Sequence, residues 1–432
     1  MIGWTGVARL GLVQMALGSV VVLTTATMNR VMVVELALPA ILPGLLVSLY
    51  YGTQFLRPRF GHGADQGGRR TPWILGGIAL LCLGAIGAAL SVGLMAQNTT
   101  LGIAAAIPSF LLIGLGIGAA GTNLLALLAV LVEQDRQAAA GSLVWIMMIF
   151  GLATTGITAG LLLDPYTHAR LVMVTVGVSA VACTLTFLGV WGQEGPARAA
   201  PQRREARFAE VIAELWEDPR VRLFTAFVFA SMLAYNLQDL ILEPFAGHVF
   251  GMSVGESTQL GGMHHAGALV GMILVLLSGT ALRRVVHVPI RLWVVGGCLL
   301  SGVALLGLAY GGTEPATWPL GPNIFLLGLA NGTFAVAAIG AMMRLAREGD
   351  EAREGLRMGL FGAAQAIAFG LGSFFGTALV DITRGIFSQD AYAYGFVFTL
   401  EGGVFLVAAA LAMKLTSPTA GAGARSAMMP GE

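Results

Sequence analysis

The sequence predicts an all-α polytopic membrane protein with twelve transmembrane helices in two similar six-helix halves. The chain is 56% hydrophobic and only 11% charged, whereas an average soluble domain has roughly 25% charged residues. Its 60 glycines in 432 residues are about twice the usual share, which suits helices whose backbones pack closely in a bilayer. Apolar stretches long enough to cross a bilayer recur from one end of the chain to the other.

Twelve spans are expected, and the first two are separated only by the break that Pro39 and Pro43 provide. The spans are residues 10–33, 39–57, 73–95, 102–132, 141–163, 169–191, 221–246, 259–281, 290–311, 320–346, 356–381 and 392–415. The first six spans form an expected N-terminal bundle at residues 1–191. The last six form an expected C-terminal bundle at residues 221–415.

Positive charge sets the expected orientation, because loops rich in Lys and Arg stay on the cytoplasmic side. With the N-terminus inside, 21 of the 24 Lys and Arg residues lie in cytoplasmic segments, and only Arg30, Arg170 and Arg384 lie at the outer side. The opposite orientation reverses this ratio. Both termini are therefore expected in the cytoplasm.

Residues 192–220 form the longest polar connection and are expected to join the two halves. The first part is rich in Pro, Ala and Arg, which is typical of a flexible linker. The second part places apolar residues at helical spacing and predicts an amphipathic helix along the inner interface. Its apolar residues are Phe208, Val211, Ile212, Leu215 and Trp216. Residues 416–432 are rich in Ala, Gly, Ser and Pro and are expected to be disordered.

The connection between the second and third spans carries the most specific local pattern. It reads GHGADQGGRR from Gly61 to Arg70. Its glycines allow a tight turn, and Asp65 can accept hydrogen bonds from Arg69 or a helix end. The pattern resembles the loop signature of the major facilitator superfamily. The resemblance implies that fold and a cytoplasmic latch formed by Gly61, Asp65, Gly68, Arg69 and Arg70. The alternative is an ordinary basic loop that obeys the charge rule.

Polar residues cluster near the outer end of the first span of each half. Ionisable groups inside a membrane are costly and therefore mark functional sites. The cluster residues are Asn29, Arg30 and Glu35 in the first half, and Asn236, Gln238, Asp239 and Glu243 in the second. The alternative is that these groups lie at the membrane edge and are simply hydrated.

The spacing of these charges predicts how they pair. Asp239 and Glu243 are four residues apart and share one face of a regular helix, so a cation, a proton or an arginine should lie nearby. Arg30 and Glu35 are about 140° apart around a regular helix and cannot pair along it without distortion. A pairing of Arg30 with Asp239 or Glu243 across helices is therefore expected.

His264 and His265 lie in the glycine-rich start of the eighth span. A histidine between small residues could ligate a metal, including the magnesium of a chlorin, because small neighbours leave room for a flat ring. The alternative is a histidine that hydrogen-bonds a neighbouring helix. Adjacent residues point about 100° apart, so at most one of the two faces any given site.

Other classes of function are excluded or disfavoured. The net charge of +1 predicts no nucleic-acid partner. Cys82, Cys183 and Cys298 each lie inside an apolar run and are expected to be small buried hydrophobes rather than metal ligands. The sequence has no catalytic triad, metalloprotease helix or phosphate-binding loop, so an enzyme is not expected.

Several stretches resemble the PucC/LhaA family of major-facilitator relatives in phototrophic bacteria. They are MNRVMVVELALPA from Met28 to Ala40, YYG at Tyr50, RPRFG at Arg57, and DLILEPFAG from Asp239 to Gly247, followed by the histidine pair. The resemblance implies a multi-pass protein of the bacterial inner membrane or photosynthetic intracytoplasmic membrane. It implies an assembly factor for light-harvesting complexes, favouring LH1 over LH2, that delivers bacteriochlorophyll a.

The resemblance also implies partners and a set of binding residues. The implied partners are light-harvesting α and β polypeptides, the reaction centre–LH1 assembly and bacteriochlorophyll synthase, together with membrane lipids. Candidate pigment- or ligand-binding residues are His264, His265, Asn29, Arg30, Glu35, Asn236, Gln238, Asp239 and Glu243. The alternative function is secondary transport of a small amphipathic or porphyrin-like solute, which the intact Gly61–Arg70 loop favours.

Overall fold

The computed structural model describes residues 2–57, 59–60, 69–134, 136–195, 219–279, 288–347 and 354–415. Several expected features lie outside the described residues. These are Gly61, Asp65 and Gly68 of the expected latch, the amphipathic helix of the linker, and the tail at residues 416–432.

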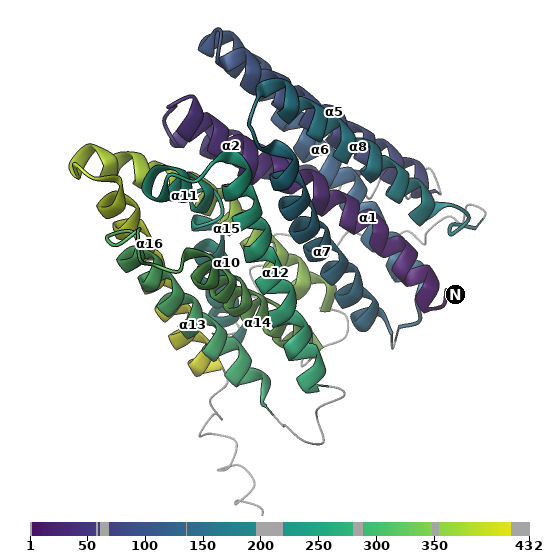
Figure 1. Ribbon diagram of the computed structural model, residues 1–432. Coiled ribbons are helices and arrows are strands. Elements are labelled where there is room, and N and C mark those ends of the chain that lie inside the picture. The colour runs from purple at the N-terminus through teal and green to yellow at the C-terminus, as the bar shows by residue number, and fades with distance from the viewer. Residues whose placement is uncertain are drawn as a thin grey trace, which may run out of the picture.

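The described part of the chain is all-helical, as the composition predicts (Figure 1). The first half contains α1 (Trp4–Val22), α2 (Met28–Arg30), α3 (Ile41–Gly52), α5 (Thr71–Met95), α6 (Thr99–Leu131), α7 (Gln137–Leu163) and α8 (His168–Val190). The second half contains α10 (Pro219–Leu237), α11 (Leu242–Phe250), α12 (Val254–Gly279), α13 (Ile290–Gly311), α14 (Leu320–Arg347), α15 (Glu354–Ile386) and α16 (Asp390–Leu415).

These helices account for the twelve expected spans. Within the described ranges, eleven helices are long and apolar enough to cross a membrane, and Ile41–Leu56 is a shorter apolar helix. Polar caps fix some helix starts: the side chain of Asn98 accepts a hydrogen bond from Leu101 N at the start of α6, and Thr167 does the same for Arg170 N at α8. The expectation for Cys183 was wrong, because it is exposed on α8, whereas Cys82 and Cys298 are buried.

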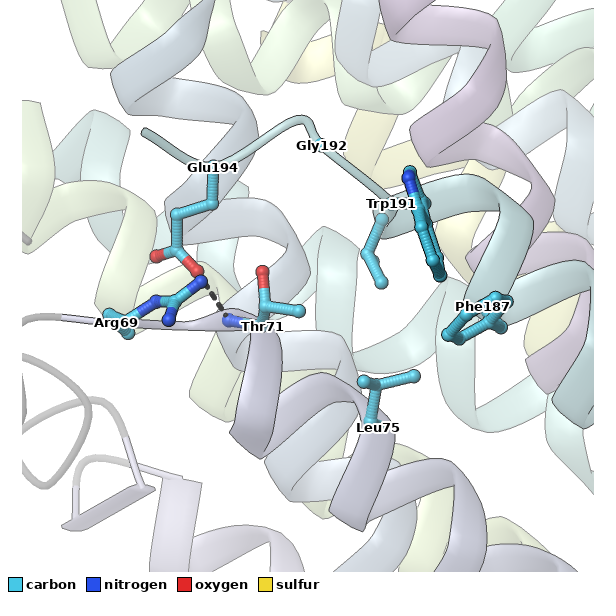
Figure 2. Close-up of a pocket in the computed structure, with 8 residues that line it drawn as sticks. Arg69, Thr71, Leu75, Phe187, Trp191, Gly192 and Glu194 are labelled. Atoms are coloured by element: carbon cyan, nitrogen blue, oxygen red, sulfur yellow. Dashed lines mark hydrogen bonds between the residues drawn. The ribbon is translucent and has the colours of Figure 1, made fainter. Parts of the chain in front are cut away.

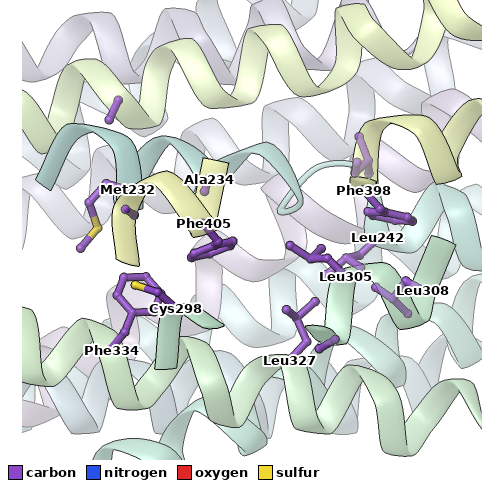
Figure 3. Packing of buried hydrophobic residues seen from close by; sticks show 14 of the residues in the cluster. Met232, Ala234, Leu242, Cys298, Leu305, Leu308, Leu327, Phe334, Phe398 and Phe405 are labelled. Atoms are coloured by element: carbon purple, nitrogen blue, oxygen red, sulfur yellow. The ribbon is translucent and has the colours of Figure 1, made fainter. Parts of the chain in front are cut away.

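Each half contains most of one large apolar core. In the second half, the ring of Phe334 on α14 lies 5.5 Å from that of Phe405 on α16 (Figure 3) and 6.3 Å from that of Tyr235 on α10. Across the halves, α3 packs on α15 and α7 packs on α12. Glycines allow the second contact: a Cβ on Gly262 would lie 2.6 Å from the backbone nitrogen of Ile157, and one on Gly156 would lie 2.8 Å from Gly262 Cα.

The first span of each half is irregular near the same end of the molecule. The first span passes through two π-helical segments, η1 (Leu23–Thr27) and η2 (Val31–Glu35). The seventh span breaks at residues 238–241, between α10 and α11. The prediction that Asp239 and Glu243 share one helix face was therefore wrong, because Asp239 lies in the break and Glu243 lies in α11.

Candidate functional site

The two irregular spans meet at an interface between the halves that we call the polar junction. The polar junction comprises Thr27, Asn29, Arg30, Glu35, Gln238, Glu243 and Thr258. These residues come from η1, α2 and η2 in the first half, and from the break, α11 and α12 in the second. Most of them are at most 3% exposed, although the side chain of Glu35 is 40% exposed.

Asn29 ties the first span to the break in the seventh. Its Nδ2 donates to the carbonyl oxygen of Leu240 at 2.5 Å. A helix break leaves backbone carbonyls without their usual partners, so a side-chain donor from the other half stabilises it. Asn29 is 1% exposed, and the bond therefore holds the two halves together away from water.

Arg30 pairs with Glu35 on its own span, so the expected pairing with Asp239 or Glu243 was wrong. The physical reason is the π-helical turn, which closes hydrogen bonds between residues five apart and brings such residues onto one face. Leu36 N, for example, donates to Val31 O at 3.0 Å. The guanidinium still reaches the other half, since its Nη2 donates to the carbonyl oxygen of Met252 at 2.6 Å.

Glu243 contacts hydroxyl groups and forms no ion pair with another described residue. Its Oε2 lies 3.5 Å from Thr258 Oγ1, which lies 3.2 Å from Thr27 Oγ1 in the other half. The carboxylate also packs on bare backbone, because a Cβ on Gly261 would lie 2.6 Å from Glu243 Oε1. Glu243, Thr258 and Thr27 thus form a short polar chain across the interface.

Several polar atoms of the polar junction are buried and make no hydrogen bond to another described residue. They are Asn29 Oδ1, Arg30 Nε, Glu243 Oε1 and both side-chain polar atoms of Gln238. Buried polar groups are nearly always bonded, so each such atom needs a partner such as water, a proton or a ligand. The polar junction therefore has the capacity to bind a small polar group.

Two candidate residues make no hydrogen bond or ion pair to the residues of the polar junction. Asn236 donates to Ser373 Oγ at 3.0 Å, which joins α10 to α15 within the second half. Asp239 is only partly buried and forms no ion pair with Arg30 or any other described residue. The sequence placed both in one cluster because it could not show that the helix breaks after Leu237.

The two histidines have different surroundings. His264 Nε2 lies 3.2 Å from Asn331 Nδ2, and Ser301 Oγ donates to Asn331 Oδ1 at 2.8 Å, so His264 is part of a network that joins α12, α13 and α14. His265 is 8% exposed, and its Nδ1 has no partner among the described residues.

The small residues beside the histidines admit neighbouring helices. Gly262 packs on α7, and a Cβ on Gly267 would collide with the carbonyl of Phe325 on α14. The expected space for a flat ring is therefore filled in this conformation. Ligation of a pigment by His264 or His265 would require α7 or α14 to move.

The sequence analysis missed two further carboxylates. Both lie at the same end of the molecule as the polar junction and bond to the other half. Asp381 on α15 accepts hydrogen bonds from Ala40 N at 2.9 Å and Ile41 N at 2.7 Å, which caps α3 from the other half. Asp164 accepts one from Ser253 Oγ at 3.0 Å. The sequence does show that the helix after Pro39 begins without a capping side chain. Its first N–H groups therefore need an acceptor from another part of the chain, and Asp381 is that acceptor.

A small pocket lies at the opposite end, where α5 begins and α8 ends (Figure 2). It has a volume of about 190 Å³ and is lined by residues that include Arg69, Thr71, Phe187, Trp191 and Glu194. Glu194 accepts hydrogen bonds from Arg70 N at 2.5 Å and Thr71 N at 2.8 Å and thereby caps α5. Figure 2 shows its carboxylate beside Arg69.

The charge of Glu194 is stabilised by this capping. Burial by itself would raise the pKa of Glu194, but hydrogen bonds from Thr71 and from the Arg70 and Thr71 backbone, with the nearby Arg69 charge, lower it below its ordinary value. Arg69 and Arg70 of the expected latch thus lie beside Glu194, an acceptor in the connection that follows α8.

Comparison with known proteins identifies relatives over nearly the whole chain. A family model described as PUCC protein matches residues 27–420. The chain is 48% identical over 412 residues to the "Bacteriochlorophyll synthase 44.5 kDa chain" of Rhodobacter capsulatus, covering 95% of each chain. It is 30% identical over 419 residues to "Protein PucC" of Cereibacter sphaeroides, covering 91% of this chain and 88% of that one.

The fold is that of solute transporters. The crystal structure of a D-xylose-proton symporter matches with a TM-score of 0.71 at 14% identity, covering 96% of this chain and 98% of the symporter. At this identity the likeness concerns the fold alone. The predicted major facilitator superfamily fold is confirmed.

Proposed function

The chain belongs to the PUCC protein family, and on that basis we propose that it is an assembly factor for photosynthetic antenna complexes. It binds light-harvesting α and β polypeptides, of LH1 in preference to LH2, and it acts on the growing reaction centre–LH1 assembly. The photosynthetic membrane of a purple bacterium is its proposed location. The observation that carries this proposal is the family match over residues 27–420, which includes every residue of the polar junction.

The family and the fold indicate a non-enzymatic, multi-pass membrane protein. One relative carries the name of a bacteriochlorophyll synthase chain. A protein without a catalytic site can carry such a name if it works in the same complex as the enzyme. We therefore include the synthase among the proposed partners.

Delivery of bacteriochlorophyll a is part of the proposal, but the pair His264 and His265 does not fit a chlorin ring in this conformation. His264 is already bonded to Asn331, and α7 and α14 fill the space beside the pair. No step is therefore assigned to these histidines. The pigment is proposed to travel with the bound antenna helices.

The test is to purify the protein gently from a phototrophic host and record its absorption spectrum together with mass spectrometry of the same sample. Antenna polypeptides with bacteriochlorophyll are expected. His264→Ala should leave the amount of pigment per protein unchanged while lowering thermal stability, because it removes a bond between α12 and α14. His168→Ala is the matched control, because it removes only a local bond to Tyr166 at the start of α8 and none between two spans.

A colourless sample without antenna polypeptides would contradict the assembly proposal. The second candidate, transport of a small amphipathic or porphyrin-like solute, is favoured by the transporter fold and by the unpartnered polar atoms of the polar junction. It predicts uptake of such a solute by proteoliposomes that contain the purified protein.

A further inference from the structure

We propose that Glu243 is a proton-binding site and that release of its proton opens the polar junction. The proposal concerns the same region as the proposed function but does not rest on the antenna role. It follows from where the carboxyl group lies, from what faces it, and from the hydrogens that its neighbours can donate.

Glu243 is enclosed by both halves of the molecule. It is 3% exposed and lies on α11, while its hydroxyl partner Thr258 lies on α12 and is fully buried. Thr258 in turn contacts Thr27 of the first half at 3.2 Å. Water can reach the carboxyl group only if these elements separate.

Glu243 has no ion-pair partner among the described residues. Arg30 of α2 is the cation whose charge acts on it, but the guanidinium is bonded to Glu35 and to the carbonyl of Met252. Asp239 in the break adds a like charge. On α12 the titratable residues are Glu256, which is exposed and accepts a hydrogen bond from Ser253 N, His264, which is bonded to Asn331, and His265, which is buried. An ionised Glu243 would therefore be a buried charge without a direct ion-pair partner, which is unfavourable.

Adding one proton from water to the carboxylate removes this charge and completes the polar chain. A threonine hydroxyl has one hydrogen to donate. When Glu243 is protonated, its hydroxyl can donate to Thr258, and Thr258 can then donate to Thr27 in the other half. When Glu243 loses its proton, the hydrogen of Thr258 is drawn to the carboxylate and the order of donors reverses.

The ionised form can be stabilised by water if the halves part at this end. Hydration of the carboxylate then offsets the loss of the contact between Thr258 and Thr27. The structure is accordingly the protonated, closed state. Raising the pH should shift the population towards an opened polar junction.

Glu401 offers a matched control, because it is buried but lies within one half. It is fully buried on α16, and neither of its oxygens has a partner among the described residues. Its neighbours on α16, Phe398 and Phe405, belong to the core of the second half. Separation of the halves would therefore not expose Glu401 to water.

Infrared spectroscopy of the purified protein in detergent tests the proton-binding step. A carbonyl band of a protonated carboxyl group is expected that Glu243→Gln removes and Thr258→Val shifts. Glu401→Gln should remove a different band, which Thr258→Val leaves in place. Failure of Glu243→Gln to remove any protonated-carboxyl band between pH 5 and pH 9 would overturn the assignment.

Spin-label distances test the opening step without any client. Gln97→Cys and Ala316→Cys, in a background without the three native cysteines, place labels on exposed loops of the two halves at the junction end. The distance between the labels is expected to widen as the pH rises, and Glu243→Gln should hold the short distance at every pH. A distance that does not change with pH, or that changes equally in Glu243→Gln, would refute the switch.

Discussion

At the scale of single residues, the contact that defines the polar junction depends on a local distortion of the helix. Arg30 and Glu35 are on opposite sides of a regular helix, yet they pair because η2 is π-helical. Arg30 is 2% exposed, so its charge needs a partner close by. Residue identities and spacing were sufficient to single out both groups. They were insufficient to pair them, because the pairing follows from backbone geometry.

Glu194 leads to a prediction about acid stability. Its pKa is lowered in the folded protein, so the stability it contributes is fully present above its ordinary value of 4.5 and is lost as the pH falls through the lowered value. Glu194→Gln should therefore lower the melting temperature by a few degrees at pH 7, and the difference from the unmodified protein should vanish in acid. Thermal unfolding in detergent across pH 3–8 measures this.

Glu314→Gln is the control for Glu194, since Glu314 is an exposed loop residue. It should unfold like the unmodified protein at every pH. If Glu194→Gln matches it, the capping of α5 does not stabilise the fold.

At the scale of elements, the sequence predicted where the helices lie but not where a helix is interrupted. Hydrophobicity and length gave all twelve spans, because only a helix satisfies its own backbone hydrogen bonds in a bilayer. The break at residues 238–241 contains no proline or glycine, and its one local signal is Pro244, which has no N–H to donate to the carbonyl of Leu240. Contacts from the other half, such as the bond from Asn29 to Leu240 O, stabilise the break.

The glycine contact between α7 and α12 predicts a strong effect of one added methyl group. Gly262→Ala would place a Cβ 2.6 Å from Ile157 N, so the two helices must move apart. We expect a clear loss of thermal stability, of about 1–3 kcal/mol, and weaker association of the halves. Gly296→Ala on α13, where nothing lies within 4 Å of the new Cβ, should be neutral or slightly stabilising. Equal stability of the two variants would disprove close packing at this seam.

The cap on α3 predicts a graded series at Asp381. Asp381→Ala removes both acceptors of Ala40 N and Ile41 N and should cost about 0.5–2 kcal/mol. Asp381→Asn keeps one acceptor and should cost less. Thermal unfolding of the two variants in the same detergent gives the order. An alanine variant as stable as the unmodified protein would show that the cap contributes nothing.

At the scale of the whole molecule, two bundles meet along two helix pairs. Because most of each large apolar cluster lies within one bundle, while Ile149 packs with Ala268 and Met272 across the seam, residues 1–191 and 221–415 expressed as two chains should associate in the membrane. A tag on one half should recover the other after gentle solubilisation. Gly262→Ala should reduce the recovery, and Gly296→Ala should not. Halves that never co-purify would contradict the two-bundle organisation.

The sequence by itself determined the class, the number of spans, the family and five residues of the polar junction, but not Thr27 or Thr258. These follow from hydrophobicity, which acts locally along the chain, and from the cost of placing charges in a membrane. Only the tertiary structure decided the partners: Arg30 with Glu35, Glu243 with Thr258, His264 with Asn331, and Asp381 with the start of α3. Partner choice depends on distances between helices far apart in the chain, and on breaks in those helices that the other half stabilises.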